Sequence, residues 1–262
     1  MKLAFRKLGA GKPLFILHGL FGFADNWQTV GKHFAEHFTV YFIDLRNHGQ
    51  SPHSNDWSYE FMSEDIKELI NDEKLDKINI LGHSMGGKTA MYFTVKYPEK
   101  VEKLVVVDIG PKKYPITNQF VIDAIEQFNP DQLKSRKEAD ELMAKYLPDT
   151  DTRQFLLKNL YWDEDQKLRW KFNYDVIKEK IAIVSEETPM PQVPIEIPAL
   201  FIKGEKSEYI FPADIKLIKA RFSNAELITI PGAGHWVHAD QPQLFFKTVS
   251  EFLLSNVAIQ TV

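Results

Sequence analysis

The segment from Ile80 to Ala90, ILGHSMGGKTA, places one serine among three glycines, between an apolar run and a run with helical character. Gly82 and Gly86 stand two residues before and two residues after Ser84. This spacing is typical of a sharp turn from a strand into a helix, where a side chain at either glycine would collide with the crossing backbone. The pattern predicts that Ser84 stands at the apex of this turn, at the carboxyl edge of a sheet.

The composition of the chain narrows its class. Hydrophobic residues make up 44% and charged residues 26% of 262 positions, which suits one globular α/β domain with an insertion. A formal net charge of −4 gives no electrostatic reason to expect nucleic acid. The sequence contains no cysteine, which excludes disulfides and thiolate chemistry. Apolar runs are too short for a membrane span, and charges interrupt the first residues, so we expect no signal peptide and a cytoplasmic protein.

Short apolar runs alternate with segments of helical periodicity. Several runs are continuous, which suits strands buried on both faces of a parallel sheet, and residues 3–7 predict an additional antiparallel strand. We therefore expect an α/β fold, a mostly parallel sheet flanked by helices. The expected strands are 14–17, 39–43, 77–81, 103–107, 199–202 and 226–230, and the expected helices are 26–36, 61–71, 85–97, 212–221 and 242–254.

Residues 112–197 break this alternation. They show no convincing strand, whereas DQLKSRKEADELMAKYL and WKFNYDVIKEKIAIV have helical spacing, and the proline-rich TPMPQVPIEIP leads back to the next strand. We expect an all-helical cap over residues 112–197, inserted into a core of residues 1–111 and 198–262. Its position in the chain predicts a lid over the sheet edge that presents Ser84.

A serine hydroxyl needs a base to become a nucleophile, and the base needs an orienting acid. In one known arrangement of a serine triad, the serine comes first in the sequence and the histidine base comes last. This order leaves His235 and His238 as candidates for the base. We favour His235 because its glycine-rich loop, PGAGHWVH, follows an expected strand. Asp108 directly follows another apolar strand, in VVVDIGP, where a buried carboxylate needs a strong partner. Glu205 and Glu208 remain alternatives for the acid.

A tetrahedral oxyanion needs preorganised donors. The backbone N–H of Met85, after the nucleophile, and that of Leu20, in LHGLFG, are the expected pair. His18, Asp44 and His48 could instead be read as metal ligands, but no closely spaced ligand pair supports this, so we expect neither a metal nor a cofactor.

His83 is expected to be structural, with its side chain pointing away from the reacting centre. The candidates for an acyl pocket beneath the lid are Phe21, Trp162, Trp170 and Trp236.

Taken together, these motifs resemble the α/β-hydrolase superfamily, and most closely the YbfF-type bacterial esterases and their mitochondrial abhydrolase relatives. The resemblance is carried by LHGLFG, DLRNHGQS, LGHSMGGK, VVDIGP and GAGHWVHAD, and by SRKEADELM, RQFLLKNL and RWKFN in the insertion. It implies hydrolysis of small carboxylic esters, or of acyl thioesters, by a cofactor-free serine esterase. That group places its acid after the sixth strand, which supports Asp108.

Two other functions stay open. Lyases and C–C hydrolases of the same scaffold share a serine triad. The pattern of the lyases, however, has an arginine after the serine motif, where this chain has Lys88. Receptors of this fold bind ligands through an intact or nearly intact triad without turnover.

Overall fold

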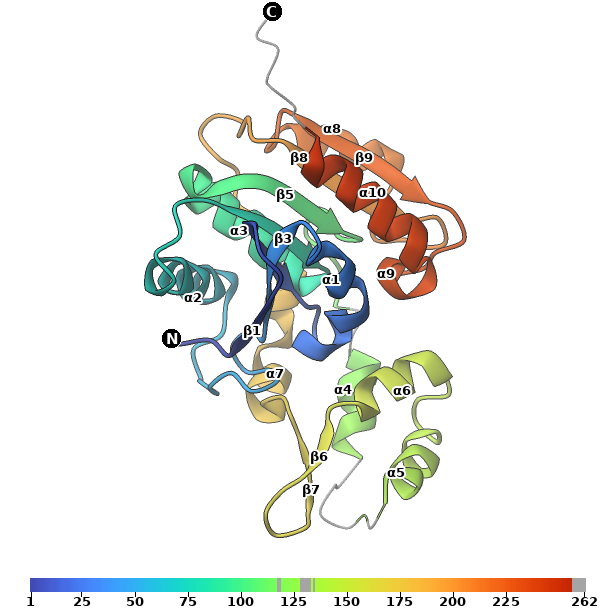
Figure 1. Ribbon diagram of the computed structural model, residues 1–262. Helices are drawn as coiled ribbons and strands as arrows, with labels where there is room; N and C mark the ends of the chain where they lie inside the picture. The colour runs from blue at the N-terminus through green and yellow to red at the C-terminus, as the bar shows by residue number, and fades with distance from the viewer. Residues whose placement is uncertain (117–118, 128–132, 134, 256–262) are drawn as a thin grey trace, which may run out of the picture.

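A seven-stranded sheet forms the centre of the computed structural model, which describes residues 1–116, 119–127, 133 and 135–255. The strand order is β1-β3-β2-β4-β5-β8-β9, with β1 antiparallel to β3 and the other neighbours parallel (Figure 1). The predicted mostly parallel sheet is confirmed, and so is the antiparallel first strand. The strands are β1 (Phe5–Leu8), β2 (Lys12–Leu17), β3 (Phe38–Ile43), β4 (Ile78–His83), β5 (Val101–Val107), β8 (Ala199–Gly204) and β9 (Ala225–Ile230).

Helices cover both faces of this sheet, which explains the continuous apolar strands. Leu14 and Ile16 of β2 pack in one buried cluster with α1 and α10, while Phe15 and Leu17 pack in a second cluster with α2, α3 and α8. The described part of the chain contains no helix long and apolar enough to cross a membrane. The helices are α1 (Gln28–Phe34), α2 (Tyr59–Asp72), α3 (Met85–Lys96), α8 (Ile215–Lys219), α9 (Val237–Asp240) and α10 (Pro242–Leu254).

Within the segment 112–197, helices α4, α5 and α6 and strands β6 and β7 lie together to one side of the central sheet (Figure 1). The prediction that this segment contains only helices was wrong, because β6 (Leu160–Trp162) and β7 (Leu168–Trp170) form an antiparallel hairpin. Each strand has only three residues, too few to show an alternating pattern in the sequence. Its helices are α4 (Gln119–Glu126), α5 (Arg136–Met143), α6 (Thr150–Leu157) and α7 (Tyr174–Lys180), and part of DQLKSRKEADELMAKYL lies outside the described residues.

The junction between β4 and α3 is as tight as the glycine spacing predicts. Ser84 connects the two elements with a left-handed φ of 53°. A Cβ atom on Gly82 would lie 2.2 Å from the carbonyl oxygen of Gly86, and one on Gly86 would lie 2.4 Å from the carbonyl oxygen of Leu17. The steric prediction for both glycines is therefore confirmed.

Two buried histidines hold the loops that follow β2 and β3. His18 Nε2 accepts a hydrogen bond from the Leu45 N–H at 3.0 Å, and His48 Nε2 accepts one from the Phe21 N–H at 3.3 Å. Burial lowers the pKa of His18 to about 4 and that of His48 to about 3, so both rings stay neutral near pH 7. Their role in the fold is to brace the loop that carries Leu20.

Replacing Gly86 by alanine should destabilise the fold by about 3 kcal/mol, because the new methyl group meets backbone atoms that cannot move aside. Gly234→Ala is the matched control, since its Cβ would meet nothing closer than 3.4 Å and should change stability by less than about 1 kcal/mol. Urea unfolding of both variants measures the difference. Equal stability of the two variants would contradict the steric argument.

The neutral histidines predict loss of stability in acid. The unfolded chain protonates His48 below its ordinary pKa, whereas the folded protein does not until about pH 3, so stability falls as the pH drops through this window. At pH 5 this residue should cost about 2 kcal/mol relative to pH 7.5. We expect His48→Gln to lose about 2 kcal/mol less than the wild type in urea unfolding between these two pH values. An equal loss in both proteins would refute the prediction.

Candidate active site

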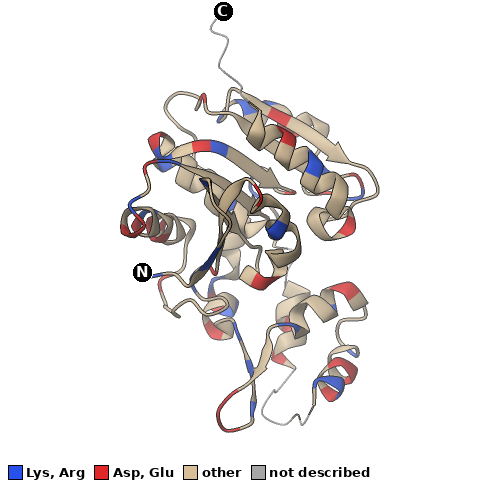
Figure 2. Cartoon of the chain, viewed as in Figure 1, with Lys and Arg blue, Asp and Glu red and all other residues tan. Residues whose placement is uncertain are grey.

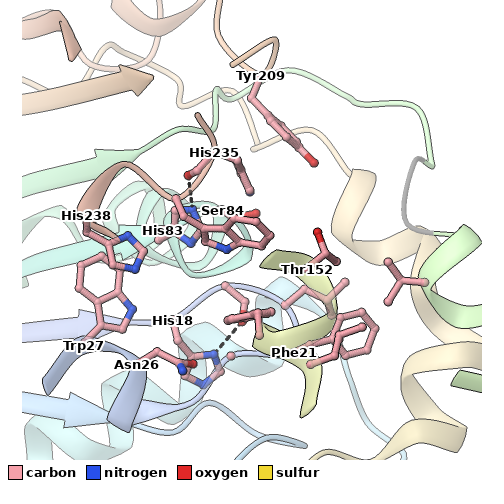
Figure 3. Close-up of a pocket in the computed structure, with 17 residues that line it drawn as sticks. His18, Phe21, Asn26, Trp27, His83, Ser84, Thr152, Tyr209, His235 and His238 are labelled. Atoms are coloured by element: carbon pink, nitrogen blue, oxygen red, sulfur yellow. Dashed lines mark hydrogen bonds between the residues drawn. The ribbon is translucent and has the colours of Figure 1, made fainter. Parts of the chain in front are cut away.

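Ser84 lies at the carboxyl end of β4 and lines a pocket of about 100 Å³ together with His235 (Figure 3). Its backbone is held on both sides, because its N–H donates to the Val107 carbonyl at 3.0 Å and its carbonyl accepts from the Lys88 N–H at 2.9 Å. The serine therefore stands on a rigid junction rather than on a mobile loop.

Asp108 and His235 meet directly at this edge of the sheet. Asp108 is fully buried immediately after β5, and its Oδ2 accepts a hydrogen bond from His235 Nδ1 at 2.8 Å. The Gly204 N–H donates to its Oδ1 at 3.0 Å, and the Ser207 hydroxyl donates to its Oδ2. These donors offset the cost of burying the carboxylate. Because the carboxylate only accepts, it fixes the proton on Nδ1 and leaves His235 Nε2 as an acceptor.

The alternative acids lie in other environments. Glu205 is exposed, and its Oε2 accepts a hydrogen bond from the Gly232 N–H at 2.8 Å. Glu208 is also exposed. The structure thus brings Asp108, rather than either glutamate, to His235.

Leu20 and Met85 flank Ser84 in a second, smaller cavity of about 30 Å³. Met85 begins helix α3, so its N–H belongs to the free N-terminal end of that helix. Neither the Leu20 N–H nor the Met85 N–H donates a hydrogen bond to another residue of the described ranges. Both donors are consequently available to a negatively charged oxygen.

Of the four predicted pocket aromatics, two line the pocket. Phe21 and Trp236 are in its wall, whereas Trp162 and Trp170 are not, so the prediction for these two residues was wrong. Trp162 is 40% exposed on the hairpin, and the Trp170 ring stacks on Phe172 with a centroid distance of 5.0 Å. The stacking of Trp170 on Phe172 depends on tertiary packing, which the sequence pattern does not encode.

Several wall residues were missed by the sequence analysis. The Phe155 ring lies 5.5 Å from Trp236, and the Tyr209 ring stacks on His235 at 4.2 Å. The apolar positions of RQFLLKNL carried a signal for Phe155 and Leu156, but no motif marked Tyr209. Helices α4 and α6 and the loop after β8 contribute the missed residues Val121, Thr152, Phe155, Leu156 and Tyr209.

The remaining histidines of the pocket serve its framework. His83 Nε2 donates to the His235 carbonyl at 2.9 Å, so His83 supports the loop of the base (Figure 3). It nevertheless lines the pocket, against the expectation that it points away. His238 stacks on Trp27 with a centroid distance of 3.9 Å. Burial lowers the pKa of His83 and lowers that of His238 to about 3, so both rings remain neutral.

Comparison with known proteins identifies the family of this fold. Residues 12–242 match the family model of the alpha/beta hydrolase fold. The Escherichia coli protein named Esterase YbfF is 31% identical over 92% of this chain and 92% of its own length. A mouse protein named sn-1-specific diacylglycerol lipase ABHD11 is 36% identical over 92% of this chain and 80% of its own.

A solved structure described as a marine microorganism esterase superposes with a TM-score of 0.94 at 47% identity. It covers 96% of this chain and 99% of its own. The chain belongs to the α/β hydrolase family.

Proposed function

We propose that this carboxylic ester hydrolase acts through Ser84 as nucleophile, His235 as general base and Asp108 as the acid that orients the base. The observation that carries the proposal is the hydrogen bond from His235 Nδ1 to the buried Asp108, beside a pocket that His235 shares with Ser84. A nucleophile, a base and an orienting acid from three different strand ends are what acyl transfer needs.

Each step of the proposed reaction is assigned to a group of this site. As Ser84 Oγ attacks the ester carbonyl, its proton passes to His235 Nε2, which is free because Nδ1 donates to Asp108. The N–H groups of Leu20 and Met85 receive the oxyanion, and the start of α3 adds its positive dipole end. The imidazolium then protonates the leaving alcohol. Water repeats the sequence on the acyl-enzyme and releases the carboxylic acid.

The segment 112–197 serves as a cap on the core formed by residues 1–111 and 198–262. Helices α4 and α6 contribute Val121 and Phe155 to the wall of the pocket that contains Ser84. Closing the pocket with apolar side chains keeps bulk water from the oxyanion and strengthens the hydrogen bonds made to it.

The dimensions of the pocket favour small, uncharged acyl groups. Its volume of about 100 Å³ is well below the ~300–1,000 Å³ of sites for drug-sized ligands. Lys and Arg alternate with Asp and Glu along the chain (Figure 2), and no described residue of these four types lines the pocket. A short-chain ester fits this site better than the diacylglycerol in the name of the mouse relative. A thioester of the same acyl size would follow the same steps.

Asp108→Asn should lower kcat by up to about four orders of magnitude, because an amide would donate to Nδ1 and impose the wrong tautomer on His235. Steady-state hydrolysis of p-nitrophenyl acetate measures the effect. Glu205→Gln and Glu208→Gln are the matched controls and should stay within about threefold of the wild type. A near-normal rate for Asp108→Asn would eliminate it as the acid.

A series of p-nitrophenyl esters from acetate to palmitate tests both the reaction and the pocket size. We expect kcat/KM to be highest for acetyl to butyryl esters and about tenfold lower for octanoate, because a longer chain must displace the wall of the cap. Ser84→Ala should abolish turnover throughout. A flat profile would contradict the size argument. Absent turnover in a protein whose Ser84 still reacts with a fluorophosphonate would favour a lyase, a C–C hydrolase or a receptor.

A further inference from the structure

Lys88 is a fully buried lysine on α3, one helical turn after Ser84. Its Nζ donates to the carbonyl of Lys112 at 2.5 Å and to the carbonyl of Glu186 at 2.6 Å. The same Nζ lies 5.1 Å from the centroid of the Tyr114 ring. A buried lysine costs folding free energy unless its donors are satisfied, and here two carbonyl oxygens and an aromatic face satisfy them. Lys88 is thus held in a specific set of contacts inside the protein.

The two carbonyls belong to two segments that lie against each other, one at the start of the cap and one just before its proline-rich return to β8. The Tyr114 N–H donates to the Ser185 carbonyl at 2.9 Å, and the Thr188 N–H donates to the Pro111 carbonyl at 2.8 Å. We call residues 111–114 and 185–188 the hinge pair. Lys88 binds one carbonyl of each member, so a single side chain of α3 holds both.

Tyr114 extends this contact toward the base. Its hydroxyl donates to the Tyr209 carbonyl at 2.7 Å and accepts from the Gly110 N–H at 2.7 Å. The Tyr209 ring in turn stacks on His235. The hinge pair is therefore connected to the residue that packs against the imidazole, and Tyr114 itself lines the small cavity beside Ser84.

We propose that Lys88 is a positioning residue that locks both segments of the hinge pair to helix α3 and thereby fixes the size of the acyl pocket. This inference rests on the proposed function, because it assigns to the cap the selection of substrate length. Burial lowers the pKa of Lys88 to about 7. The ammonium has three N–H donors and the neutral amine has two, so either form can bind both carbonyls.

A second buried lysine provides a matched control. Lys103 on β5 is only 7% exposed, and its Nζ donates to the carbonyls of Phe252 at 2.7 Å and Ser255 at 2.6 Å. It thus holds the end of α10 as Lys88 holds the hinge pair, and its Nζ makes no hydrogen bond to the described residues of the cap. Replacing either lysine by methionine removes the charge and leaves backbone carbonyls unpaired.

The test compares Lys88→Met with Lys103→Met in the hydrolysis of p-nitrophenyl acetate and octanoate. In Lys88→Met the ratio of kcat/KM for octanoate to that for acetate should rise about tenfold, because the cap is no longer held against the pocket. In Lys103→Met the ratio should stay within about twofold of the wild type, whatever the loss in stability. A wild-type ratio in Lys88→Met would overturn the proposal.

Amide hydrogen exchange supplies a readout that needs no ester hydrolysis. The amides of Tyr114 and Thr188 should exchange at least about tenfold faster in Lys88→Met than in Lys103→Met. One outcome is that the wild type hydrolyses no ester while this difference in exchange still appears. In that case Lys88 does hold the hinge pair, but the proposed function is wrong. If these amides exchange at the wild-type rate in Lys88→Met, Lys88 does not hold the hinge pair, whatever the activity of the variant.

A milder variant covers the case in which Lys88→Met does not fold. Tyr114→Phe keeps the ring beneath Nζ and removes only the hydroxyl that joins Gly110 to Tyr209. It should raise the octanoate-to-acetate ratio by about threefold and speed the exchange of the Thr188 amide. If both quantities keep their wild-type values, the proposal is wrong.

Discussion

The close crossing of helix α3 over the carboxyl ends of β2 and β4 is the constraint on which the rest of the structure depends. Gly82 and Gly86 allow this approach, because any side chain there would overlap backbone atoms. The crossing places the free N–H of Met85 and the loop of Leu20 on the two sides of Ser84. In the proposed mechanism, a helix start and a loop from a different strand would hold the oxyanion through backbone N–H groups, without any charged side chain.

Backbone strain gathers at the same edge of the sheet. Phe21, Ser84 and Asp108 have left-handed φ values of 58°, 53° and 50°, and each follows a strand of the central sheet closely. Such conformations cost on the order of 1–3 kcal/mol each for residues other than glycine, so the surrounding packing must enforce them. The buried clusters on both faces of the sheet supply that packing. The strain fixes where the three residues direct their side chains and amides, which a relaxed loop would not do.

The strands and the position of Asp108 could be predicted because they depend on patterns that run along the sequence. The hairpin and the ring contacts of the pocket could not, because they depend on tertiary packing. Continuous apolar runs such as KLVVV predicted the parallel strands, and the position of Asp108 just after one of them placed it at the edge where His235 lies. The hairpin β6–β7 was missed because its strands are too short to show an alternation of apolar and polar residues. Trp170 was assigned to the pocket wrongly because its stacking partner, Phe172, cannot be read from spacing. Tyr209 was missed for the same reason.

The distribution of charge around the pocket explains why one of several neighbouring histidines suits the role of base. Burial lowers the pKa of four of them, so near pH 7 they are neutral and act only as fixed donors, acceptors and packing surfaces. These four are His18, His48, His83 and His238. His235, in contrast, hydrogen-bonds to the Asp108 carboxylate, and its side chain is 24% exposed. In the proposed mechanism, the Asp108 carboxylate would stabilise the positive charge that His235 gains from Ser84, whereas burial disfavours such a charge on the other rings.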